Sequence, residues 1–422
     1  MPGRTAGRKI RFSKRFLFER LSPGADSSMV RTAKQTPVQL ETPMCPNLQD
    51  SGPRRILSLS GGGVRGIVEV AFLEEVDLAV KKRYGPDASI ADVFHLIGGT
   101  STGALIATAL SLGLPLSTIK DFYLTRATRF FGRRRWWAWG QAPVYDGAQL
   151  EAEIRQIIGD VKLGDPEFQS FVALVTKRLD TGSAWIVSNI PTSPYFEDPP
   201  HGGYVGNRHY EMARLLKAAT AAPVYFEQTP VHVGTDQLAT FVDGGLSPYN
   251  DPSLALLKLA RLRAFGLEWP VGIDNLHVLS IGTGRFRQRI DPRTAARMGP
   301  VRLAFLSMLG MAGDAEEQAL TMMQWLGHSV LPQRVNSEIG DLAQDTLAPE
   351  PLFRYLRLDL PLEQEALSNL GISPEIKDIR RLQRMDDPEV ILPLYDITKA
   401  FIAQGPDIGT LIFGADKGGG SS

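Results

Sequence analysis

The amino-acid sequence predicts an α/β protein, a three-layer sandwich with a mainly parallel central sheet followed by C-terminal helices. A short apolar segment at residues 56–59 is followed by a glycine turn and then by an amphipathic segment at residues 66–82. The same order of strand, glycine turn and helix recurs over residues 92–112, and this repetition is typical of parallel α/β sheets. Three more apolar segments have the length of buried strands, at residues 171–175, 184–187 and 277–281.

The composition is that of a globular protein. Of the 422 residues, 43% are hydrophobic and 22% are charged, which excludes a mainly disordered chain. Lys plus Arg and Asp plus Glu both number 46, so the net charge of +0 argues against a protein that holds a nucleic-acid polymer through a global positive field. The single cysteine, Cys45, excludes an intramolecular disulfide and a cysteine-based zinc cage.

Four regions are expected along the chain. Residues 1–53 are basic, polar and rich in proline, so we expect a disordered extension, with an electrostatic tether to an anionic surface as the alternative. Residues 54–300 form the expected α/β domain, and residues 301–414 form a helical region packed on it. Residues 415–422 form a flexible tail.

A G-x-S-x-G motif lies between a predicted strand and an apolar helix. It occupies residues 99–103, with Ser101 at its centre. A serine at such a tight turn needs small neighbours, and its hydroxyl lies at a helix N-terminus, where developing negative charge is favoured. The sequence therefore predicts a nucleophile at Ser101, and the alternative is a helix N-cap made by Ser101 or Thr102.

A second glycine turn, at residues 61–66, also lies between a strand and a helix. Three successive glycines can direct bare N–H groups at one point, and in acyl transfer that point is the oxyanion of the tetrahedral intermediate. Gly61, Gly63 and Gly66 also fit the dinucleotide motif G-x-G-x-x-G. That motif needs an acidic residue at the end of the next strand, where this sequence has the serine turn instead.

A serine nucleophile needs a base. Asp243 follows two apolar strand residues and precedes two glycines, which puts a carboxylate in an open turn at a strand end. The alternative for Asp243 is an Asx turn. Of the six histidines, His277 and His328 have the chain order of a Ser-Asp-His hydrolase, but both have the surroundings of structural histidines.

Together these three segments resemble the patatin-like phospholipase family. Its hallmarks are G-G-G-x-[RK]-G, then G-x-S-x-G about forty residues later, then D-G-[GA], and they match residues 61–66, 99–103 and 243–245 in that order. The resemblance covers roughly residues 54–290. Two other segments are similar to blocks of the family, at residues 217–226 and 279–284.

The resemblance implies a Ser-Asp dyad without a metal or an organic cofactor. Ser101 is then the nucleophile, and Asp243 is the base that activates first Ser101 and then water. Arg65 either lies near the lipid phosphate or braces the glycine loop. Three backbone N–H groups are implied to hold the oxyanion, those of Gly61, Gly62 and Gly63.

One local segment suits a membrane interface, because arginines meet anionic headgroups and tryptophans lie at headgroup level. It combines three guanidinium groups with three indoles: Arg133, Arg134, Arg135, Trp136, Trp137 and Trp139. The alternative is a core or lid segment with inward indoles and outward arginines.

We therefore expect a serine hydrolase that cleaves carboxylic esters of phospholipids or lysophospholipids at a membrane surface. The alternatives are a Ser-His-Asp esterase acting on soluble esters and a non-catalytic protein that binds lipid or a nucleotide. The resemblance also admits activation by a partner or a cyclic nucleotide. No apolar stretch reaches the roughly 18 residues of a membrane span, so the expected location is the cytoplasm, peripheral at membranes, with an organelle-targeting N-terminal arm as the alternative.

Overall fold

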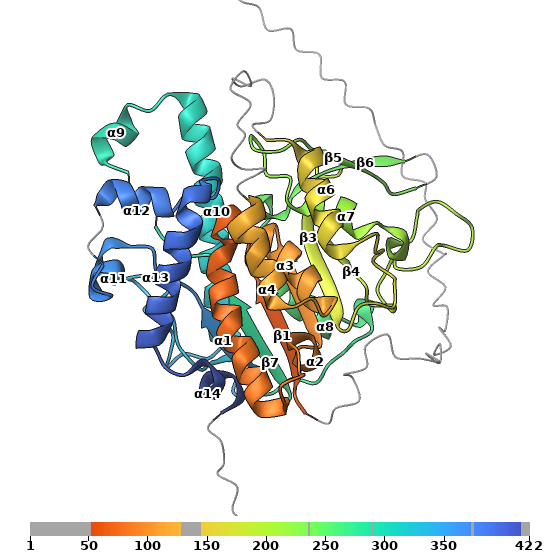
Figure 1. The fold of residues 1–422 in the computed structure, drawn as a ribbon, viewed down its shortest axis with the longest axis horizontal. Coiled ribbons are helices and arrows are strands. Elements are labelled where there is room, and N and C mark those ends of the chain that lie inside the picture. The colour runs from red at the N-terminus through yellow and green to blue at the C-terminus, as the bar shows by residue number, and fades with distance from the viewer. Residues whose placement is uncertain (1–51, 128–144, 235–236, 288–289, 373–374, 415–422) are drawn as a thin grey trace, which may run out of the picture. The chain divides into compact units, whose positions relative to one another are not determined.

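The computed structural model describes residues 52–127, 145–234, 237–287, 290–372 and 375–414. Its central element is a nine-stranded sheet in the order β5-β6-β3-β2-β1-β7-β9-β8, with β4 also paired to β3. Helices lie on both faces of this sheet (Figure 1). The predicted α/β class with a mainly parallel sheet is therefore confirmed.

The carboxyl ends of three parallel strands are level with one another. β1 (Arg54–Leu59) lies between β2 (Leu96–Thr100) and β7 (Leu276–Ile281), and Leu59 is level with Gly99 on one side and Ile281 on the other. The loops that follow these three strands therefore emerge at the same edge of the sheet.

The remaining strands extend this sheet on both sides. β3 is parallel to β2, β9 is parallel to β7 and β8 is parallel to β9, whereas β4, β5 and β6 pair antiparallel. Their bounds are β3 (Phe171–Arg178), β4 (Ala184–Ser188), β5 (Thr229–His232), β6 (Leu238–Asp243), β8 (His328–Ser329) and β9 (Arg354–Leu358).

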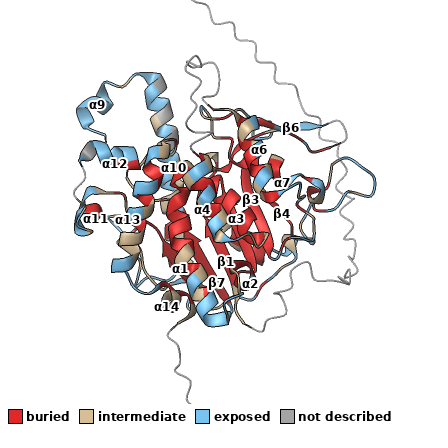
Figure 2. Ribbon diagram, viewed as in Figure 1, coloured by how far each residue is buried: buried red, intermediate tan, exposed pale blue. Residues whose placement is uncertain are grey.

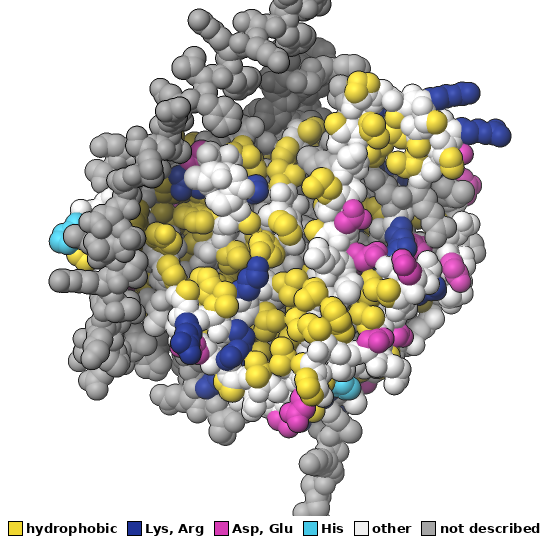
Figure 3. All heavy atoms as spheres, turned by 180° about the vertical axis from the view of Figure 1, so that it is seen from behind, with side chains coloured by type: hydrophobic (Ala, Val, Ile, Leu, Met, Phe, Trp, Pro, Cys, Tyr) yellow, Lys and Arg dark blue, Asp and Glu magenta, His cyan; other side chains and the backbone are white. Residues whose placement is uncertain are grey.

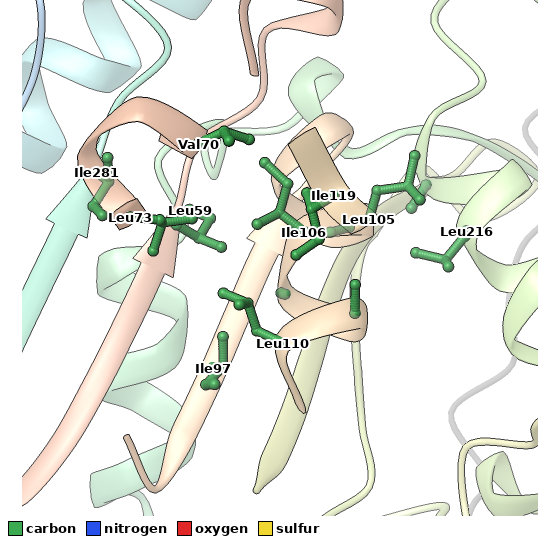
Figure 4. Packing of buried hydrophobic residues seen from close by; sticks show 14 of the residues in the cluster. Leu59, Val70, Leu73, Ile97, Leu105, Ile106, Leu110, Ile119, Leu216 and Ile281 are labelled. Carbon is green, nitrogen blue, oxygen red and sulfur yellow. The ribbon is translucent and has the colours of Figure 1, made fainter. Parts of the chain in front are cut away.

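Alternating side chains build two cores, one on each face of the sheet. Leu57 and Leu59 pack on the side of α1 (Gly66–Tyr84), α3 (Thr102–Ser111) and α4 (Leu116–Asp121). Figure 4 shows Leu59 among other residues of this core. Ile56, Leu96 and Ala173 face the other way, toward α8 (Ser253–Arg261) and the last turns of α10 (Pro300–Leu326). The strands are buried in between (Figure 2), which gives three layers.

The C-terminal helices return to the first helix. Phe401 of α13 (Ile391–Gln404) contacts Phe72 edge to face at 6.4 Å between ring centroids, and Phe413 of α14 (Ile408–Phe413) contacts Tyr84 at 5.7 Å. The helices not yet bounded are α2 (Ile90–Val93), α6 (Gly147–Ile158), α7 (Met212–Ala219), α9 (Pro292–Ala296), α11 (Gln364–Asn369) and α12 (Ile376–Leu382).

Two expectations about the elements are wrong. Residues 301–414 are not only helical, because β8 and β9 lie in the same sheet as the N-terminal strands, and β9 pairs with β7 along its whole length. Residues 92–93 end the short helix α2 instead of starting a strand, because Ser89 and Asp92 form a capping box.

The expected N-terminal extension up to residue 51 and the tail at 415–422 lie outside the described residues. Among the helices that the structure describes, none has both the length and the apolar character needed to cross a membrane.

Candidate active site

Ser101 lies at a strained turn between β2 and α3. Its backbone has φ 54° and ψ −121°, a left-handed conformation that non-glycine residues rarely adopt and that costs about 1–3 kcal/mol. The Ser101 side chain makes no capping hydrogen bond to α3. The N-cap alternative therefore does not describe the Ser101 hydroxyl, and the hydroxyl is free for another partner.

The glycines of the G-x-S-x-G motif are required by close packing. A Cβ on Gly99 would collide with the backbone of Gly103, and a Cβ on Gly103 would collide with the carbonyl oxygen of Leu59. The end of β1, the end of β2 and the start of α3 therefore touch each other through backbone atoms. This contact fixes the backbone conformation of the turn that contains Ser101.

The structure brings Ser101 and Asp243 into direct contact. Ser101 Oγ donates a hydrogen bond of 2.6 Å to Asp243 Oδ2, although the residues are 142 positions apart. The other carboxylate oxygen, Oδ1, accepts the N–H of Gly245 at 2.7 Å. The Asx turn and the contact to Ser101 are thus both present, one on each oxygen of the same carboxylate.

Asp243 is buried at the end of β6, with 5% of its surface exposed. Burial raises the pKa of Asp243 to about 6, although the hydrogen bonds from Ser101 and the Gly245 N–H act to lower it. A carboxylate with a pKa near 6 is a stronger base than an ordinary aspartate and is still ionised at neutral pH. The site therefore holds a hydroxyl directly bonded to a basic carboxylate.

The glycine loop lies beside Ser101, because a Cβ built on Gly61 would be 3.3 Å from Ser101 Cβ. The prediction for Gly61 needs one correction. Its N–H donates to the Asn250 carbonyl oxygen at 3.0 Å and is therefore not available to an oxyanion. Within the described residues no acceptor is bonded to the N–H of Gly62 or Gly63, so two of the three predicted donors remain.

Arg65 is held inside the protein, with 8% of its surface exposed. Its guanidinium donates to the Gly284 carbonyl oxygen at 3.0 Å and lies over the Phe286 ring at 5.1 Å. Burial lowers the pKa of Arg65, while the nearby carboxylates of Glu316 and Asp359 act in the opposite direction. These contacts fit the loop-bracing alternative and offer no support for contact with a lipid phosphate.

Sequence reasoning missed the side chains that hold the glycine loop. The Gly61 carbonyl oxygen accepts hydrogen bonds from Thr283 Oγ1 at 2.9 Å and from Asn250 Nδ2 at 3.3 Å. Asn250 Nδ2 also bonds Glu316 of α10. Thr283 lies in the segment at 279–284 that was singled out in the sequence, but nothing in the local pattern marks Asn250 or Glu316.

A buried ionic cluster lies behind the same loop. Arg357 of β9 donates to Asp251 at 2.9 Å, to Asp359 at 2.8 Å and to Ser60 Oγ at 3.1 Å. All three charged residues are less than 9% exposed. Burial acts to lower the pKa of Arg357, but Asp251 and Asp359 outweigh it, so that this pKa is raised and the guanidinium stays charged. The cluster therefore fixes Ser60, the residue that leads into the glycine loop.

The histidines proposed as alternative bases lie elsewhere. His277 is the second residue of β7 and His328 begins β8, and both are level with Arg354 at the start of β9. Ser101, by contrast, follows the carboxyl end of β2. Burial lowers the pKa of His277 to about 4, and its ring nitrogen bonds the Ile273 carbonyl oxygen at 2.9 Å. Neither histidine is placed to serve Ser101.

The segment predicted to contact a membrane, residues 133–139, lies outside the described residues. In the part of the chain that the structure describes, no group of three or more His, Cys, Asp or Glu is arranged to hold a metal ion.

Comparison with known proteins places this site in a family. Residues 57–257 match the family model described as patatin-like phospholipase. A cGAMP-activated phospholipase of Vibrio cholerae serotype O1 is 25% identical over 332 residues, which cover 75% of this chain and 84% of that protein. A cGAMP-activated phospholipase of Escherichia coli is 27% identical over 325 residues, which cover 75% of this chain and 83% of that protein.

A relative from Solanum tuberosum matches over a shorter region. Patatin group J-1 of Solanum tuberosum is 27% identical over 281 residues, covering 61% of this chain and 69% of that protein. The matched family region contains the glycine loop, the serine turn and the aspartate turn that meet in the structure. Residues 57–257 therefore form a patatin-like phospholipase domain.

Proposed function

We propose that this protein hydrolyses the carboxylic esters of phospholipids or lysophospholipids through a dyad of Ser101 and Asp243. The observation that carries the proposal is the hydrogen bond of 2.6 Å from Ser101 Oγ to a carboxylate whose pKa is raised to about 6. The patatin-like phospholipase domain supports lipid acyl hydrolysis as the reaction class.

In the first half-reaction, Ser101 Oγ attacks the ester carbonyl carbon while its proton moves to Asp243 Oδ2. The carbonyl electron pair moves onto oxygen, and the resulting oxyanion accepts hydrogen bonds from the N–H groups of Gly62 and Gly63. The tetrahedral intermediate then collapses, the bond to the leaving alcohol breaks and that alcohol takes the proton from Asp243. Each oxyanion donor contributes about 2.7–4 kcal/mol to lowering such a barrier.

The second half-reaction regenerates the enzyme. Water attacks the acyl–Ser101 ester, and Asp243 accepts the proton of that water. Collapse of the second tetrahedral intermediate returns the proton to Ser101 and releases the fatty acid. One buried carboxylate thus serves both halves, which requires it to be ionised before each attack.

The nucleotide-activated relatives suggest how the reaction is controlled. Two relatives that match three quarters of this chain carry the description cGAMP-activated phospholipase. We propose that a cyclic nucleotide of this kind activates the present chain as well.

The experiment that tests the function measures fatty-acid release from phosphatidylcholine and lysophosphatidylcholine, with and without cGAMP. We expect wild type to release fatty acid, with more release when cGAMP is present, and Ser101→Ala to release none in either condition. Hydrolysis of a soluble ester without lipid hydrolysis would favour the soluble-ester alternative. Binding of lipid or cGAMP with no hydrolysis of any ester would favour the non-catalytic alternative.

The pH profile follows from the buried carboxylate. Because Asp243 must be ionised to accept a proton and its pKa is about 6, we expect kcat/KM to rise about tenfold per pH unit below pH 6 and to level off above it. The measurement is kcat/KM for a soluble ester across the acid range. A flat profile through pH 6 in wild type would contradict the assignment, and the residual activity of Asp243→Asn should lack this acid limb.

A further inference from the structure

A helical arm of this protein has mostly exposed side chains among those that the structure describes. The arm comprises residues 290–313, which include α9 and the first half of α10. Its apolar residues Ile290, Leu303 and Met311 are 39%, 53% and 71% exposed. Figure 2 shows α9 and the start of α10 mostly in the colour of exposed residues, and in Figure 1 they extend away from the other elements.

Three glycines of the arm face open space among the described residues. A Cβ built on Gly299, Gly310 or Gly313 meets no atom within 4 Å. Further along the same helix, Leu320 and Met323 are buried in the core between the sheet and α8. The second half of α10 is therefore anchored, and the first half is a continuation of it with apolar side chains in the open.

The arm carries a positive charge. Arg293, Arg297 and Arg302 are all exposed, and Asp291 is the one acidic residue between positions 290 and 313. The Asp291 carboxylate is occupied as the N-cap of α9, where it accepts the N–H and hydroxyl of Thr294. In Figure 3, the view from behind, Lys and Arg side chains project beside a group of hydrophobic side chains at the corner where this arm lies.

The C-terminal end of the arm lies close in sequence to a residue that supports the glycine loop. Glu316, three residues beyond it, bonds the side-chain amide of Asn250, and the Asn250 carbonyl oxygen holds the N–H of Gly61. Because three residues are less than one helical turn, the exposed part of α10 starts within one turn of the residue that supports the glycine loop. The arm is therefore joined through Glu316 and Asn250 to the glycine loop beside Ser101.

We propose that residues 290–313 dock on an anionic phospholipid surface and so bring Ser101 to its substrate, an inference that rests on the proposed function. Exposed apolar side chains interspersed with arginines are what a helix lying in the headgroup region presents to lipid. The exposed turns of α10, residues 300–313, would extend about 21 Å along that surface. The arm lies on the surface, since no described helix is able to span a bilayer.

The test is cosedimentation of the full chain carrying Ser101→Ala, so that no lipid is consumed, with phosphatidylcholine vesicles that contain or lack phosphatidylglycerol. In that background, replacing Arg293, Arg297 and Arg302 by alanine should weaken binding to the anionic vesicles on the order of 100-fold. Leu303→Glu with Met311→Glu should weaken it about tenfold or more on both vesicle types. Leu262→Glu is the matched control, because Leu262 is 50% exposed but follows the end of α8, outside the arm, and it should bind as the parent does.

The same substitutions in the arm are then made in a chain that keeps Ser101. Their effects separate this inference from the proposed function. We expect the arm variants to lose hydrolysis of vesicle lipid and to keep hydrolysis of a soluble ester, which also shows that they are folded. Unchanged vesicle binding by both arm variants would overturn the inference. The inference would also be overturned if the arm variants bound vesicles as the parent does but differed from it in mass at sedimentation equilibrium. That result would assign the arm to contact between two copies of the chain. Binding that depends on the arm without hydrolysis by the intact chain would instead refute only the proposed function.

Discussion

Asp243→Asn is expected to lower kcat for ester hydrolysis about 10⁴-fold, close to the loss expected for Ser101→Ala. Asparagine keeps the size of the side chain, and its oxygen can still accept the Gly245 N–H, so the turn at 243–245 should persist. What is lost is the basic oxygen 2.6 Å from Ser101 Oγ. The measurement is single-turnover and steady-state kinetics on a soluble ester.

Two controls make this prediction specific. Asp198→Asn removes a carboxylate that accepts the Gly206 N–H and pairs with His209, and it should leave kcat unchanged. The double variant of Ser101 and Asp243 should be no slower than either single variant, because the two residues act as one unit. Independent, multiplicative losses would mean that Asp243 does not act through Ser101.

Arg357→Met is expected to be the most destabilising of the substitutions considered, at about 3–5 kcal/mol of unfolding free energy. The substitution leaves the carboxylates of Asp251 and Asp359 buried at 3% and 6% exposure without their cation. It also releases Ser60 Oγ at the base of the glycine loop. Denaturant unfolding monitored by circular dichroism measures the loss.

A rescue variant tests the cause of this loss. Adding Asp359→Asn to Arg357→Met removes one of the uncompensated charges and should recover part of the stability. The control is Arg263→Met, since the Arg263 side chain is 92% exposed and should leave the unfolding midpoint unchanged. If the double variant instead lost the sum of the unfolding free energies lost by the two single variants, the stabilising role of Arg357 would not come from neutralising the carboxylates.

Those parts of the fold that depend on local pattern could be predicted from the sequence. The glycine turns at residues 61–66 and 99–103 each follow an apolar strand and could be predicted. Glycine is the residue expected where the chain turns sharply, because it has no side chain to collide with its neighbours. The predicted aspartate turn at 243–245 likewise follows β6. These three turns converge because the register of the sheet aligns the strand ends, which the motif order alone does not state.

The parts that were missed depend on contacts between distant segments. The N–H of Gly61 bonds a carbonyl oxygen 189 positions away, so its loss as an oxyanion donor could not be inferred from three consecutive glycines. Strand β9 was missed because Arg354 and Arg357 interrupt its apolar pattern, and Arg357 is tolerated inside only because Asp251 and Asp359 neutralise it. A residue such as Asn250 has no local signal at all, since its role comes from holding Gly61 and Glu316 together.

The central claim, that Ser101 is activated by Asp243, is tested most directly by mapping the adduct formed with a fluorophosphonate probe. Peptide mass spectrometry should find the phosphonyl group on Ser101 in wild type, and labelling should be slower by several orders of magnitude in Asp243→Asn. Labelling of another residue, or equal labelling rates in wild type and Asp243→Asn, would contradict the account.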